Sequence, residues 1–126
     1  MPYESGFLKK CQALAASHLK GTIDLDSFAK KANDLYASRE KWTEYVMDVC
    51  QAPKYVELSS KGAEYGEQGL REWEEGFRCW FDYIANEDSE LVDEGLLAMR
   101  KGNDLFNAAR DAFLDVSEDT NVRFTL

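Results

Sequence analysis

Residues that interrupt helices are scarce in this sequence. Its 126 residues include only two prolines, Pro2 and Pro53. Proline breaks a helix because it lacks an N–H donor and its ring clashes with the preceding turn. The long stretches without proline therefore favour long helices.

Long apolar runs are also absent. The unbroken apolar stretches are only a few residues long, far short of the ~20 needed to span a bilayer. No basic segment followed by an apolar core opens the chain, so we expect no secretory signal. The three cysteines are widely spaced and odd in number, which favours free thiols in a reducing compartment: Cys11, Cys50 and Cys79. These features predict a cytoplasmic protein that does not enter membranes.

Motifs that carry chemistry are missing as well. The sequence has no G-x-S-x-G, no phosphate loop, no C-x-x-C pair and no calcium-loop pattern. The only histidine, His18, excludes the paired Glu-x-x-His motifs of di-iron bundles, and two turns of helix (~10 Å) separate it from Cys11. We interpret His18 as a partly buried histidine with its hydrogen bonds satisfied; a ligand role is the alternative. We expect no catalytic residue, no metal and no cofactor.

Helical periodicity is what the sequence does contain. Apolar residues recur with a period near 3.6, and 44% of residues are hydrophobic, enough for one core in a single domain, 1–126. Gly21 suits a helix C-terminus, and Asp24 and Ser89 suit N-caps. The pattern predicts an all-α, antiparallel, up-down-up-down four-helix bundle with a short tail at 117–126. The expected helices span about 3–20, 25–51, 54–86 and 89–116.

The third expected helix contains an unusual number of glycines. The stretch "KGAEYGEQGLREWEEGFRCWFDYI", residues 61–84, holds four of them, and each costs roughly 1 kcal/mol relative to alanine inside a helix. At 100° per residue the glycines lie on the same stripe as the tryptophans, and Gly95 and Gly102 occupy a similar stripe in the next helix.

An antiparallel hairpin that turns between Glu87 and Asp88 would bring large residues opposite small ones. The expected pairs are Trp80 with Gly95, Trp73 with Gly102, Gly76 with Met99, Gly69 with Phe106 and Gly62 with Phe113. The glycines would then be notches that receive rings in a packed core. The alternative is a small-ligand pocket lined by Gly69, Trp73, Gly76, Trp80, Gly95, Gly102 and Phe106.

Negative charge is concentrated in one third of the chain. Of the net charge of −9, residues 64–94 carry eleven acids and two bases, whereas the segments on either side are close to neutral. Such a field opposes nucleic acid and anionic membranes and favours basic partners or cations; a solvated face is the alternative. The expected interaction face comprises Glu72, Glu74, Glu75, Asp82, Glu90, Asp93 and Glu94.

We therefore expect a small cytosolic protein without catalytic activity that binds another protein, one with a basic surface, or binds itself as a homodimer. An acidic inhibitor or immunity-type protein is one version of this function. The alternatives are a small-ligand-binding bundle and a structural homo-oligomer subunit.

Overall fold

The computed structural model describes residues 5–51 and 60–120, with side chains described for 5–39, 44 and 60–112. These residues form four α-helices: α1 (Gly6–Leu19), α2 (Leu25–Gln51), α4 (Ser60–Asn86) and α5 (Glu90–Thr120). The all-α, four-helix prediction is confirmed.

Local signals explain where the helices begin and end. The hydroxyl of Ser5 accepts a hydrogen bond from the backbone N–H of Leu8 and caps α1, and Asp24 caps α2 by accepting from the N–H of Ser27 at 2.8 Å. Gly21 has a φ of +79° and donates to the carbonyl of His18. Gly21 thus ends α1 in the left-handed conformation that glycine adopts most easily, as its position in the sequence predicts.

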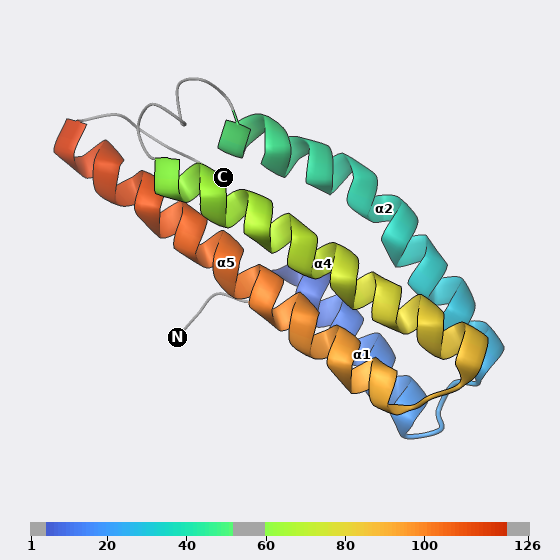
Figure 1. Ribbon diagram of the computed structural model, residues 1–126. Coiled ribbons are helices and arrows are strands. Elements are labelled where there is room, and N and C mark those ends of the chain that lie inside the picture. The colour runs from blue at the N-terminus through green and yellow to red at the C-terminus, as the bar shows by residue number, and fades with distance from the viewer. Residues whose placement is uncertain (1–4, 52–59, 121–126) are drawn as a thin grey trace.

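The helices alternate in direction and form an antiparallel bundle (Figure 1). The α1–α2 loop and the α4–α5 turn lie at the same end, which we call the closed end. Each helix packs on two neighbours in the order α1, α2, α4, α5 and back to α1, and the α4–α5 interface is by far the most extensive. At 14 residues, α1 is about half as long as α2 and α4, so it covers only the part of the bundle near the closed end.

The α4–α5 interface is built from glycine. A Cβ atom added to Gly95 would lie 2.8 Å from the carbonyl oxygen of Gly76, and one added to Gly102 would lie 2.9 Å from that of Gly69. The two backbones therefore meet at two glycine pairs, where any side chain would hold the helices apart. This close approach explains why helix-destabilising residues occur here.

Aromatic rings fill the space between the helices. Trp80, Phe77 and Phe28 are fully buried, and Phe28 lies against Trp80 with ring centroids 5.2 Å apart. Phe7 of α1 packs edge-on against Trp73 at 5.3 Å. Rings from α1, α2 and α4 thus form one continuous core.

Two helix boundaries differ from the prediction. The last helix continues to Thr120 and not to about Val116, so it includes the first residues of the predicted tail. The first helix begins at Gly6, after the Ser5 cap. The expected helical start at residues 54–59 lies outside the described residues, as do the side chains of Cys50 and Phe113.

Candidate functional site

The glycine notches between α4 and α5 hold rings. A Cβ atom at Gly95 would meet Cδ1 of Trp80 at 2.5 Å, and one at Gly102 would meet Cδ1 of Trp73 at 2.7 Å. A Cβ atom at Gly69 would likewise meet the ring of Phe106 at 2.8 Å, and one at Gly76 would meet Cγ of Met99 at 2.6 Å. Four of the expected pairs of a large residue with a glycine therefore occur. At these positions the packed arrangement is present, and the side chains proposed as pocket lining occupy the notches themselves.

The expected acidic face divides into two groups. Four of its seven carboxylates are in ion pairs: Glu72 with Lys101, Glu74 with Arg39, and both Glu75 and Asp82 with Arg78. The hydrogen bonds that Arg78 donates to Glu75 are the main reason why the pKa of Glu75 lies below its usual range. The other three have no ion pair with any described residue: Glu90, Asp93 and Glu94.

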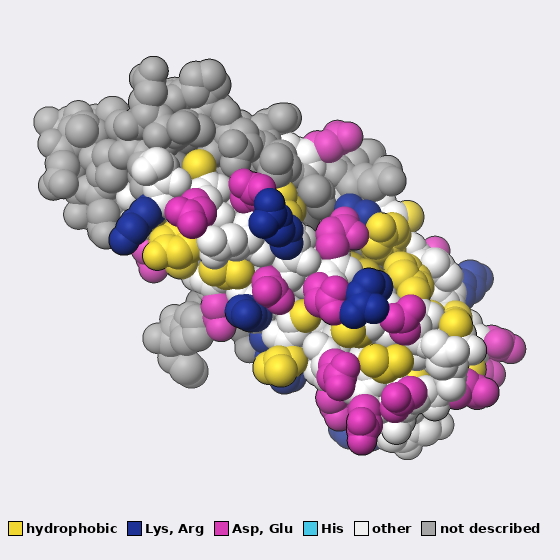
Figure 2. Space-filling view, in the orientation of Figure 1, with side chains coloured by type: hydrophobic (Ala, Val, Ile, Leu, Met, Phe, Trp, Pro, Cys, Tyr) yellow, Lys and Arg dark blue, Asp and Glu magenta, His cyan; other side chains and the backbone are white. Residues whose placement is uncertain are grey.

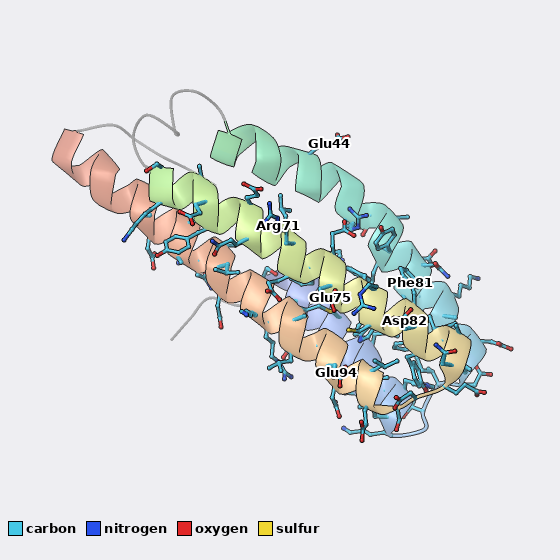
Figure 3. All side chains as sticks on the ribbon, in the orientation of Figure 1. Glu44, Arg71, Glu75, Phe81, Asp82 and Glu94 are labelled. Carbon is cyan, nitrogen blue, oxygen red and sulfur yellow. The ribbon has the colours of Figure 1, made fainter. Side chains whose placement is uncertain are left out.

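The unpaired carboxylates lie on the N-terminal side of an exposed leucine on α5, and Arg100 and Lys101 follow it by one helical turn. Leu97 is 67% exposed, the highest value among the large hydrophobic side chains described. It lies one helical turn after Asp93 and Glu94 and two turns after Glu90, so all four share one face. We call these four residues the acidic ridge. Figure 2 shows acidic side chains gathered at the closed end of the molecule, where α5 begins. Figure 3 places Glu94 on the same side as Glu75 and Asp82.

A half-buried arginine of α2 pairs with an acidic residue of α4. The guanidinium of Arg39 lies 3.8 Å from the centroid of the Tyr36 ring, and its side chain is only 14% exposed. It donates to Glu74 at 2.8 Å, and Tyr36 donates to the other oxygen of the same carboxylate at 3.3 Å. Glu74 thus helps to hold α2 against α4, and its charge is compensated within the fold.

A groove runs along α4 beside this cluster, with a volume of about 590 Å³. Its apolar lining consists of Tyr36, Leu70 and Phe81, and the Tyr36 ring stands edge-on to Phe81 at 5.1 Å. Charged residues that pair along α4, among them Arg71 and Asp82, form its rim (Figure 3). We call this the α2–α4 groove.

A second groove, of about 400 Å³, lies between α1 and α2. Apolar side chains form its floor and two lysines stand on its rim, one from each helix. We call it the lysine groove. Its lining residues are Lys10, Ala13, Leu14, Ser17, Ile23, Lys31, Asp34 and Leu35.

His18 connects three segments of the chain. Its Nδ1 lies 3.0 Å from the carbonyl oxygen of Ile23, which can only accept, so Nδ1 carries the proton in the neutral ring. Nε2 then accepts from the hydroxyl of Tyr83 on α4, and the ring stacks on Phe28 at 4.8 Å. The expected satisfied, partly buried histidine is present, and its contacts are structural.

The two cysteines whose side chains are described are free and buried. Burial raises the pKa of the Cys11 thiol to about 12 and, more weakly, that of Cys79, where Glu75 adds to the effect. Since the thiolate is the reactive form, burial makes both groups poor nucleophiles. They belong to the core.

Some of these features leave a trace in the sequence and others do not. The Arg78 ion pairs have the i,i+3 and i,i+4 spacings that a helix brings together. Asn103 gives no such signal: it is 5% exposed and accepts a hydrogen bond from the backbone N–H of Ser5 at 3.2 Å. This bond fixes the start of α1 on α5, and only the packed bundle reveals it.

Comparison with known proteins leaves the function to be argued from these surfaces, because no protein-family model, curated protein or solved structure matches the chain. Within the described ranges, no helix has both the length and the apolar character that a membrane span requires. Nor do the described side chains include a group of three or more His, Cys, Asp or Glu residues placed to hold a metal ion.

Proposed function

We propose that this chain is a small, non-catalytic cytoplasmic protein that binds another protein through the acidic ridge. The observation that carries the proposal is Leu97, a leucine exposed among carboxylates that have no ion pair with described residues. An apolar anchor within a polar rim is the arrangement found at the centre of protein interfaces. The charge on the rim favours a partner with a basic surface.

The ridge is better suited to this role than the rest of the expected face. Glu74 and Glu75 are held by arginines of the chain itself, so a partner would have to compete with bonds that already exist. Asp93 and Glu94 have no such bond with a described residue to lose on binding. An inhibitor or immunity-type protein that neutralises a basic partner is one concrete form of this function.

Affinity capture from the source cells, followed by mass spectrometry and titration of the purified partner, tests the proposal. Replacing Asp93 with asparagine and Glu94 with glutamine should weaken binding by about tenfold or more at low salt, and high salt should weaken binding to the native chain. The matched control is Glu44→Gln with Glu64→Gln, which removes two exposed acids on α2 and α4 and should leave the affinity nearly unchanged. An affinity that ignores both salt and the ridge substitutions would refute the proposal.

The α2–α4 groove favours a second candidate function, the binding of a small ligand. Its volume of about 590 Å³ is within the range of ligand sites, and it combines aromatic surface with charged groups. A thermal-shift screen of small aromatic cations and anions tests this function. A stabilising compound should lose its effect in a Phe81→Ala variant; retention of the effect would place its site elsewhere.

A further inference from the structure

The part of the bundle formed by α1 and the first part of α2 is basic, whereas α4 and α5 are acidic. Residues 5–39, which form α1, its loop and the first part of α2, include six basic and three acidic side chains. Residues 60–112, on α4 and α5, include six basic and thirteen acidic ones. Over residues 5–51 the bases and acids nearly balance, at seven and six, so the basic surface is confined to α1 and the first part of α2. Because α1 packs on α5 and α2 packs on α4, this basic part lies against the acidic α4–α5 hairpin.

Folding gathers lysines that are far apart in the sequence into one groove. The pairs at 9–10 and 30–31 each contribute one residue, Lys10 and Lys31, to the rim of the lysine groove. Neither forms an ion pair with a described residue, and Asp34 is the only acid in the lining described. The groove is therefore net positive.

The floor of the same groove is apolar. Leu14 is buried, whereas Ile23 and Leu35 are half-buried and present part of their side chains to the groove. Covering this surface with another apolar group would stabilise a complex by ~25 cal/mol per Å² removed from water. The occupant that fits has an apolar side chain flanked by negative charges.

The chain carries such an element on its opposite half. On the acidic ridge, Leu97 is exposed and Asp93 and Glu94 lie one turn before it. We propose that the lysine groove receives the acidic ridge of a second copy of this chain. Leu97 packs on the apolar floor, and the two carboxylates pair with Lys10 and Lys31. The inference rests on the proposed function and identifies its partner.

The geometry of this contact dictates the form of the assembly. The groove lies between α1 and α2 and the ridge lies on α5, on opposite halves of the bundle, so the contact is heterologous. A dimer formed through it still offers one free groove and one free ridge. Association therefore continues from copy to copy until a ring closes or a filament forms. The net charge of −9 on each copy opposes this, but at physiological salt it is screened beyond ~8 Å, whereas the contacting pairs are not.

Two variants, each defective on one surface, test the proposal by analytical ultracentrifugation. The groove variant is Lys10→Glu with Lys31→Glu, and the ridge variant is Glu94→Gln with Leu97→Ser. The mass of the native chain should rise above the 14.4 kDa of the monomer with increasing concentration, whereas each variant alone stays monomeric. An equimolar mixture should form a dimer and nothing larger, since only one intact ridge can meet one intact groove.

Matched controls separate this contact from general effects of charge and apolar surface. Lys9→Glu with Lys30→Glu changes the other lysine of each pair, and Glu64→Gln with Leu19→Ser changes an acid of α4 and the leucine that is 50% exposed. Both controls should associate as the native chain does. Circular dichroism confirms that every variant is folded.

The inference is overturned if the native chain stays monomeric up to millimolar concentration, if either surface variant associates normally, or if the mixture forms no dimer. A monomeric chain whose captured partner still requires Asp93 and Glu94 would leave the proposed function standing and this inference refuted. Loss of ridge dependence in both experiments would refute both.

Discussion

Replacing Gly95 with alanine adds one methyl group at the tightest contact between α4 and α5. The new Cβ would lie 2.5 Å from Cδ1 and 2.7 Å from Nε1 of Trp80, and 2.8 Å from the carbonyl oxygen of Gly76. The indole cannot rotate away without breaking its hydrogen bond from Nε1 to the carbonyl of Val92, which is 3.1 Å long. The carbonyl of Gly76 is backbone and can move only with its helix.

The expected effect is a net loss of stability. Alanine gains ~1 kcal/mol over glycine in helix propensity. Overpacking a core costs ~1–3 kcal/mol, and a contact with backbone at this distance favours the upper end. We expect Gly95→Ala to lower the free energy of unfolding by ~2 kcal/mol and the melting temperature by roughly 5–10 °C in a chain of this size.

Urea unfolding followed by circular dichroism measures this change. Gly6→Ala is the matched control, because beyond the adjoining residues and the backbone of its own helix no atom lies within 4 Å of a Cβ added there. It should be neutral or stabilise by up to ~1 kcal/mol. Trp80→Ala alone should cost ~3–5 kcal/mol, and combined with Gly95→Ala the loss should be smaller than the sum by ~1 kcal/mol, because the indole has left the contact. A Gly95→Ala variant as stable as the native chain would refute the register of the hairpin.

Three further predictions follow from the buried and capping groups. Burial raises the pKa of Cys11 to about 12 and also raises that of Cys79, so iodoacetamide at mildly alkaline pH should label these two thiols only after unfolding. Rapid labelling of Cys11 or Cys79 in the folded chain, located by peptide mass mapping, would contradict this. His18→Phe and Tyr83→Phe should each cost ~1–2 kcal/mol of unfolding free energy, and a double variant with strictly additive losses would show that their hydrogen bond contributes nothing. The hydrogen bond that Asp24 accepts from the N–H of Ser27 holds the pKa of Asp24 below its usual range in the folded chain. The capped carboxylate therefore stabilises the fold fully at pH values above the usual pKa of aspartate, and this contribution is lost as the pH falls through the lowered pKa. Asp24→Ala should therefore reduce the acid sensitivity of urea unfolding, and an unchanged pH profile would argue against the cap.

The sequence is sufficient for features that depend on helical spacing. The register of α4 on α5 could be predicted because large and small residues alternate along both helices, so that Trp73 and Gly102 meet once the turn is placed. The candidate surfaces were only partly predictable. The seven acids of the expected face look alike in the sequence, but Arg39, which compensates Glu74, comes from α2, and its position depends on how α2 packs on α4.

The lysine groove illustrates what sequence reasoning misses. Its two rim lysines are twenty-one positions apart and look like scattered charges until α1 and α2 lie side by side. The exposure of Leu97 is equally hidden, because its neighbours Leu96 and Ala98 are buried and all three belong to one apolar run.

The few polar bonds that fasten α1 have a consequence for local unfolding. Beyond its buried side chains, α1 is attached through Asn103 at its start, the bond from Arg100 to Gln12 at 3.2 Å in its middle, and His18 at its end. A helix of 14 residues with such an attachment can open without the α4–α5 hairpin, and hydrogen exchange should reveal it as a separate unit of lower protection. Since α1 forms one wall of the lysine groove, an occupant binds only while α1 is docked. At a free concentration [L], the occupant therefore raises the free energy of opening α1 by RT ln(1 + [L]/Kd). Occupancy of the groove would thus be recorded as slower exchange in α1, even in residues that the occupant never touches.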